Sequence, residues 1–466
     1  MDVRDTTVEA LAGLVRAREV SATELTQAAL DRIDAVNPTI NAFVSVDGDL
    51  ALADAARVDE EVAAGRDPGP LAGIPIGVKD LEDATGFVTT QGSLLRRDDA
   101  PAGADSAFVS RLRAAGCVVI GKTNTPELGA KGQTSNRLFG ITRNPWDPAR
   151  TAGGSSGGSA AALAAGLVPL ATGSDGGGSI RIPASICGLT GMKPSLGRVP
   201  IGGGSPPGWA DLSPRGPMAV RARDTAFVLD RVVGPDPTDL RSLPMPDISW
   251  RAALDDLHAP LRVAWAPTLG YSPVDPEVLS ICQSAVDALA AAGSEIVDTP
   301  SVFPVDPIEP WLVLTSASNL RTVQDLQGTE DWALLDDPIR TTAEWAAQRL
   351  SAADVLSAQD ACHQLNLTLV SLFRSVSLLV TPTVAAKAPP VDTDGVLDGH
   401  PDPNWIRFTY PFNLTRSPAG TVCAGFTSED LPVGLQVIGP QHADVAVLRL
   451  LTFMEDLLAL DRRAPV

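Results

Sequence analysis

Residues 151–198 read TAGGSSGGSAAALAAGLVPLATGSDGGGSIRIPASICGLTGMKPSLGR. The stretch holds two serines in glycine-rich settings, Ser155 and Ser179, and the residues between them include no His, Cys, Glu or Lys. Glycine lets the backbone adopt conformations that are closed to other residues, so that a ligand can approach main-chain N–H groups closely. A flexible linker has a similar Gly and Ser content, but the intervening AAALAAGLVPLATG is apolar. We therefore interpret the stretch as a packed part of the protein that carries chemistry.

A nucleophilic serine needs a base, and a lysine upstream, Lys79, is the candidate. It ends the apolar segment 74–78, where burial would lower the pKa of its amine and favour the neutral, basic form. The strand alone favours a different role, a surface lysine paired with Asp80. The serine pair favours Lys79 as a base acting through a second serine, because all four histidines follow residue 250: His258, His363, His400 and His442.

The loop around Ser179 has further features of a catalytic site. The amides of Gly176, Gly177, Gly178 and Ser179 could point together as an oxyanion hole. Asp175 and Arg181 flank these residues, and an ion pair between them could hold the loop in shape.

Two other motifs are present formally. Ser155 and Ser156 both satisfy G-x-S-x-G, with His400 or His442 as the base, but residues 144–152 are typical of a loop rather than of the strand that this motif requires. Residues 116–123, GCVVIGKT, match a phosphate-binding loop. The four residues between its glycines are typical of a strand, so we do not expect a nucleotide site.

Composition excludes several classes of function. The net charge of −20 and the pI of about 4.6 argue against binding to nucleic acid and to an anionic membrane surface. The five scattered cysteines predict reduced, buried thiols without disulfides or a zinc site. The N-terminus lacks the apolar core of a signal peptide, and residues 160–173 are too short to span a bilayer. We expect a cytoplasmic protein.

Helix and strand signals alternate along the chain, which predicts an α/β fold with a buried sheet between helices. A capping box at Ser21 and Glu24 starts an early helix, which we expect to stop at Asn37-Pro38. Predicted helices cover 107–115, 158–165, 277–292 and 445–460, and predicted strands cover 74–78, 117–120, 168–171, 261–266, 295–297, 378–381 and 433–438. We expect one domain, 1–466, with a helical cap inserted around 299–353. The Trp residues at 209, 311, 332, 345 and 405 lie outside the core motif, and some could line a substrate pocket although each is a candidate for plain packing.

Five motifs give the chain a resemblance to the amidase signature family over nearly its whole length. They are LAGIPIGVKD (71–80), GKTNTPELGAKGQTSNRLFGITRNPWDPARTAGGSSGGSAAALAAG (121–166), GSDGGGSIRIPASICGLTGMKPS (173–195), FTYPFNLTRSPAG (408–420) and LPVGLQVIGPQHADVAVLRL (431–450).

The resemblance implies the amidase signature fold, with a large mixed β-sheet sandwiched between α-helices. It implies a Ser–cis-Ser–Lys triad in which Ser179 is the nucleophile, Ser155 the bridging serine with a cis peptide bond, and Lys79 the base. It assigns the oxyanion hole to the amides from Gly176 to Ser179, and it needs no metal or cofactor. Ser174 stands where threonine is frequent in the family, and Gly176 stands where a larger residue is frequent.

Such a site predicts a hydrolase that cleaves small or aryl amides through an acyl-enzyme, and also esters and carbamates (urethanes). Its partners would be small-molecule substrates, with specificity set by the loop 202–212 and the cap; a homodimer is left open. The alternative is the glutaminase (A) subunit of a tRNA-dependent amidotransferase, which passes ammonia to a partner protein. A non-catalytic binding protein is the third option.

Overall fold

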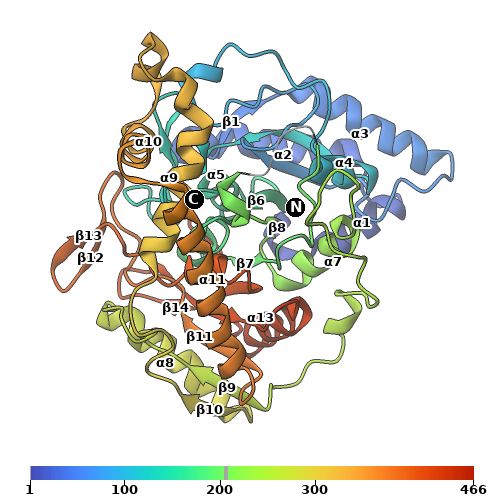
Figure 1. Ribbon diagram of the computed structural model, residues 1–466. Coiled ribbons are helices and arrows are strands. Elements are labelled where there is room, and N and C mark those ends of the chain that lie inside the picture. Colours follow the sequence, from blue (N-terminus) through green and yellow to red (C-terminus); the bar gives the residue numbers. More distant parts are fainter. Residues whose placement is uncertain (1, 204–207) are drawn as a thin grey trace.

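The computed structural model describes residues 2–203 and 208–466, and within them eleven strands form one mixed sheet (Figure 1). The strands are β1 (Phe43–Val46), β2 (Pro75–Lys79), β3 (Val118–Thr123), β6 (Leu170–Ser174), β7 (Thr190–Lys193), β8 (Arg215–Ala219), β9 (Arg262–Trp265), β10 (Glu295–Asp298), β11 (Leu378–Pro382), β14 (Ala419–Phe426) and β15 (Pro432–Ile438). Their order is β1-β3-β2-β6-β8-β7-β14-β15-β11-β9-β10. Strand β2 runs parallel to β3 and β6, whereas β8 is antiparallel to both β6 and β7. Two small ribbons pair β4 (Ser135–Asn136) with β5 (Gly140–Ile141) and β12 (Gly395–Leu397) with β13 (His400–Asp402).

Helices surround this sheet, which runs from β1 near the top of Figure 1 to β10 at the bottom. They are α1 (Val8–Arg16), α2 (Ala22–Ile40), α3 (Gly48–Ala63), α4 (Ala107–Ala114), α5 (Gly157–Ala164), α6 (Arg181–Ile186), α7 (Ala222–Val232), α8 (Pro276–Ala291), α9 (Ile308–Val323), α10 (Asp337–Arg349), α11 (Ala352–Leu372), α12 (Pro411–Leu414) and α13 (Asp444–Leu458). Helices α2 and α3 lie near the β1 end, and α8 lies by β9 and β10. The predicted α/β class, with a large mixed sheet between helices, is confirmed.

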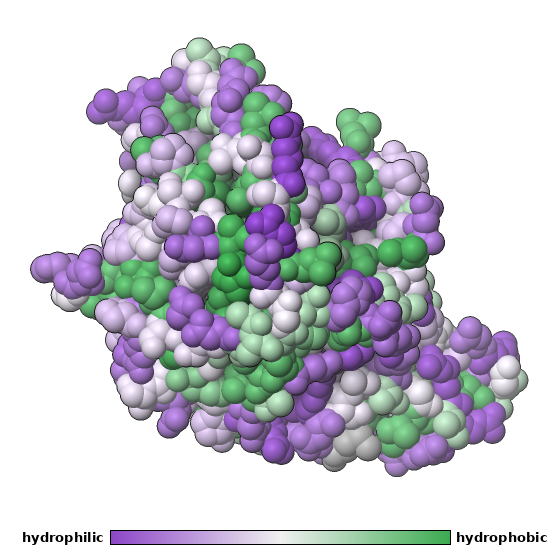
Figure 2. Space-filling view, turned by 90° about the horizontal axis from the view of Figure 1, so that it is seen from below, coloured by the Kyte–Doolittle hydropathy of each residue, from purple (hydrophilic) through white to green (hydrophobic). Residues whose placement is uncertain are grey.

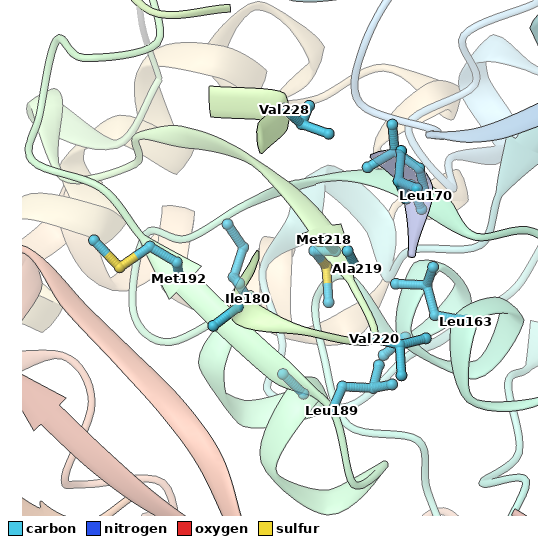
Figure 3. Packing of buried hydrophobic residues seen from close by; sticks show 14 of the residues in the cluster. Leu163, Leu170, Ile180, Leu189, Met192, Met218, Ala219, Val220 and Val228 are labelled. Atoms are coloured by element: carbon cyan, nitrogen blue, oxygen red, sulfur yellow. The ribbon is translucent and has the colours of Figure 1, made fainter. Parts of the chain in front are cut away.

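The apolar segment between the two serine regions forms the centre of the core. Every residue of α5 and of β6 is buried. Figure 3 shows Leu163 of α5 and Leu170 of β6 near Met218 and Ala219 of β8. The small side chains of α5 are required, because a Cβ atom on Gly158 would lie 2.3 Å from the Asn124 backbone nitrogen. The core therefore fixes the two ends from which the serine loops emerge.

The predicted stop of the early helix at Asn37-Pro38 is wrong, since α2 continues to Ile40. A proline in the last turn removes one backbone hydrogen bond, and the turn is held in other ways. Asn41 adopts the left-handed conformation (φ 50°) and its N–H donates to the Asn37 carbonyl. The Asn37 side-chain oxygen accepts from the amide of Phe43 (2.8 Å). The local cap thus outweighs the proline.

The segment 299–353 contains α9 and α10, which pack together around a small apolar cluster that includes Val323, Ile339 and Ala343. Its description as a cap inserted in one domain stays a prediction. In the loop 202–212, residues 204–207 lie outside the described residues.

The surface and the cysteines agree with the sequence. All five cysteines are buried and free, as predicted. Figure 2 shows one face on which hydrophilic and hydrophobic residues are interspersed. No helix within residues 2–203 and 208–466 has the length and apolar character needed to cross a membrane.

Candidate active site

Lys79 lies at the end of β2 with its side chain fully buried, surrounded by three serine hydroxyls. Its Nζ is 2.8 Å from Ser155 Oγ, 2.8 Å from Ser156 Oγ and 2.9 Å from Ser174 Oγ. The Lys79 N–H donates to Thr172 Oγ1 of the neighbouring strand (2.8 Å), which fixes the backbone from which the lysine extends. The structure thus brings Lys79 and Ser155 together. The sequence interpretation did not identify Ser156 and Ser174 as partners of the lysine.

The alternative pairing of Lys79 with Asp80 does not occur. Asp80 instead pairs with Lys122 of β3, whose Nζ lies 3.4 Å from Asp80 Oδ1 in an equally buried position. Burial lowers the pKa of Lys79 well below its usual range, and the positive charge of Arg215 lowers it further, while Glu82 acts in the opposite direction. No carboxylate forms an ion pair with Lys79 in the described chain, so the neutral amine is favoured.

The hydrogen-bond pattern narrows which serine can act with this amine. A neutral amine has one lone pair and two N–H groups, so one of the three hydroxyls must donate to it. The Ser156 hydroxyl donates to the Ser174 carbonyl oxygen (3.3 Å). Ser155 and Ser174 therefore remain as the donors to Lys79.

Ser155 and Ser179 open onto one cavity of about 360 Å³. The peptide bond between Gly154 and Ser155 is cis, as the resemblance implied. The Ser156 amide donates to the Ser179 carbonyl oxygen (3.1 Å), which ties the two serine loops together. Among the described residues, Ser179 Oγ has no hydrogen-bond partner, and its side chain faces the cavity from the residue pair that precedes α6. A hydroxyl in this position is open to a ligand, and catalytic hydrogen bonds often tighten only when substrate is bound.

A buried ion pair shapes the loop 175–179. Arg181 Nη2 lies 2.8 Å from Asp175 Oδ1 and its Nε lies 2.9 Å from Oδ2, with both side chains fully buried. Burial acts to raise the pKa of Asp175, but the guanidinium of Arg181 outweighs it and holds that pKa well below its usual range. The Gly178 N–H also donates to Asp175 Oδ1 (2.8 Å). Within the described chain, the amides of Gly176, Gly177 and Ser179 have no protein acceptor.

Distant segments complete the support of Arg181. Its Nη1 donates to the Thr409 carbonyl (2.9 Å) and to Gln436 Oε1 (2.6 Å), and its Nη2 donates to Asn413 Oδ1 (2.7 Å). These three residues lie in the motifs 408–420 and 431–450, but the sequence interpretation assigned them no role.

Aromatic residues cover the other side of the loop. Trp209 lines the cavity, and a Cβ atom on Gly176 would lie 2.8 Å from its ring, so the glycine makes room for the indole. Trp311 of α9 contacts Trp209 edge to face (centroids 5.8 Å apart). The remaining predicted tryptophans lie elsewhere: Trp405 is buried in another cluster, and Trp332 and Trp345 lie in or near α10.

The competing motifs do not form sites. Within the described residues, the cavity lining includes none of the four histidines. Residues 118–123 of the phosphate-loop match form strand β3. The described residues also contain no group of three His, Cys, Asp or Glu close enough to hold a metal ion.

Comparison with known proteins gives one consistent result. Residues 24–448 match the family model described as Amidase. An acylamidase from Rhodococcus erythropolis is 38% identical over 453 residues, covering 94% of this chain and 92% of that protein. A glutamyl-tRNA(Gln) amidotransferase (A) subunit from Chloroflexus aurantiacus is 36% identical over 95% of each chain. The crystal structure of a bacterial aryl acylamidase of the amidase signature enzymes superposes with a TM-score of 0.91 at 28% identity, covering 99% of each chain.

Proposed function

Since the chain belongs to the amidase signature family and is an amide hydrolase of that family, we propose that it cleaves small or aryl amides through an acyl-enzyme on Ser179. The observation that carries the proposal is the fully buried Lys79 amine 2.8 Å from Ser155 Oγ, on the wall of the cavity that also holds Ser179. A base, a bridging hydroxyl and an unpartnered nucleophile are the three parts that the reaction needs.

In the proposed relay, neutral Lys79 accepts the proton of Ser155, which accepts the proton of Ser179 as Ser179 Oγ attacks the substrate carbonyl. The proton then returns through Ser155 to the leaving nitrogen, because an amide anion is a very poor leaving group. Water cleaves the acyl-enzyme by the same relay, which regenerates Ser179 and releases the acid.

We assign the oxyanion to the amides of Gly176, Gly177 and Ser179. The sequence interpretation included Gly178 as well, but the hydrogen bond from its amide to Asp175 makes it a support of the loop. Preorganised N–H donors of this kind stabilise the charge that develops on the carbonyl oxygen, and removal of one typically lowers kcat by about 10²- to 10³-fold.

The same machinery would accept esters, whose alkoxide leaves more easily than an amine, and aryl carbamates. A second candidate function is the glutaminase subunit of a tRNA-dependent amidotransferase, which is favoured by 36% identity to such a subunit over 95% of the chain. The similarity to an acylamidase covers an equal part of the chain, and the self-contained site supports an enzyme that acts alone.

The test is hydrolysis by the purified chain alone of an anilide, a primary amide, an aryl carbamate and an aryl ester, with glutamine as a fifth substrate. We expect turnover of the anilide by the wild type and none by Ser179→Ala. Turnover that persists in Ser179→Ala would contradict the assignment. Silence on the first four substrates, with glutamine hydrolysed only after a partner is added, would favour the amidotransferase function.

A further inference from the structure

Side chains from remote segments hold three consecutive carbonyl groups of the loop 175–179. Asn413 Nδ2 donates to the Asp175 carbonyl (2.5 Å), Trp311 Nε1 donates to the Gly176 carbonyl (3.1 Å), and Thr409 Oγ1 donates to the Gly177 carbonyl (2.5 Å). Two of these donors come from the segment that also supports Arg181. The third, Trp311, comes from α9 in the segment predicted as a cap.

The bond from Trp311 has a direct consequence for the amide next to it. The peptide group is planar, so in a trans peptide the C=O and the N–H point in opposite directions. Holding the Gly176 carbonyl toward the indole therefore turns the Gly177 N–H away from the indole. That N–H has no protein acceptor within the described chain, whereas the next amide, Gly178, is committed to Asp175.

Trp311 is itself held rigidly. Its ring stacks on Tyr410 (centroids 5.5 Å apart, planes at 27°), and Tyr410 Oη donates to Asp306 Oδ1 (2.5 Å). Its edge contact with Trp209 closes the other side. A Cβ atom on Gly177 would lie 2.7 Å from the indole, so the loop backbone lies directly against the ring. A donor fixed by packing on several sides can hold a peptide in one orientation at little entropic cost.

We propose that Trp311 is a positioning residue: its indole N–H fixes the Gly176–Gly177 peptide so that the Gly177 N–H is available to the developing oxyanion. The inference rests on the proposed function and adds to it a residue outside the family motifs. Through α9, it links the predicted cap to the chemical step.

The variant that isolates this role is Trp311→Phe, which retains an aromatic ring against Tyr410 and removes the N–H. Trp332→Phe is the matched control, because Trp332 Nε1 donates to Glu344 (3.2 Å) at the surface and loses the same kind of bond. The readouts are kcat and KM on an anilide, the affinity for an arylboronic acid that forms a tetrahedral adduct on serine, and the midpoint of thermal unfolding.

For Trp311→Phe we expect kcat to fall about 10-fold, less than when an oxyanion donor is deleted, with KM within twofold of wild type. The boronic acid should bind about 10-fold more weakly and the unfolding midpoint should be unchanged; Trp332→Phe should match wild type in every readout. A wild-type kcat in Trp311→Phe, or a rise in KM alone, would overturn this inference while the proposed function stands. A wild-type chain without Ser179-dependent turnover would overturn both.

Discussion

Replacing Asp175 by asparagine keeps the shape of the side chain and removes the charge that faces Arg181. Both side chains are fully buried, and Asp175 is the one carboxylate paired with this guanidinium in the described chain. Breaking a buried pair by removing one partner costs about 3–5 kcal/mol, because the other charge is left uncompensated. Asparagine can still accept one hydrogen bond, so we expect a loss in unfolding free energy of about 3 kcal/mol, a large part of the usual 5–15 kcal/mol.

Urea unfolding, followed by tryptophan fluorescence, measures this loss as a lower midpoint. The exposed pair of Asp461 and Arg463 provides the control, and Asp461→Asn should unfold at the wild-type urea concentration. The double variant Asp175→Leu/Arg181→Met should be more stable than Asp175→Asn, since it leaves no buried charge. An unchanged midpoint in Asp175→Asn would refute the reasoning.

Three further predictions concern Lys79, Lys122 and the glycines. Turnover should fall as pH falls, because a protonated Lys79 cannot accept a proton. Arg215 lowers and Glu82 raises the pKa of Lys79, so this acidic limb should move to higher pH in Arg215→Gln and to lower pH in Glu82→Gln; shifts of the same sign would exclude Lys79 as the titrating group. Lys122→Met should lower the unfolding free energy by about 3–5 kcal/mol, since it leaves the Asp80 carboxylate buried without its partner, and an unchanged urea midpoint would contradict this. Gly177→Ala should lower kcat by about 10²-fold, because its Cβ would meet Trp311, whereas Gly13→Ala, with no atom nearby in α1, should stabilise the protein by up to about 1 kcal/mol; equal activities of the two variants would contradict the first part.

The sequence predicted the fold and the principal site residues because both depend on local patterns. Apolar runs such as 74–78 and 168–171 mark buried strands whatever lies beside them. The family motifs place Lys79, Ser155 and Ser179 on the ends and loops of those strands. The early helix shows the limit of such patterns, since a general rule for proline did not include the specific cap that Asn37 provides.

The contacts that the sequence did not predict depend on register and on long-range packing. The pairing of Asp80 with Lys122 follows from the alignment of β2 with β3, which contains an irregularity between Ile76 and Gly77. The bond from Trp311 to Gly176 joins residues 135 positions apart. Helical periodicity indicates which face of α9 is buried, but it does not indicate which loop that face contacts.

Locating the covalent intermediate would test the role of Ser179 as the nucleophile without relying on the loss of activity in a variant. Wild-type protein would be mixed with an excess of an aryl ester, quenched in acid within the first turnover and digested for mass spectrometry. We expect the mass of the acyl group on the peptide that contains Ser179, and its absence in Ser179→Ala. An acyl group on another residue, or turnover with no covalent adduct at all, would contradict Ser179 as the nucleophile.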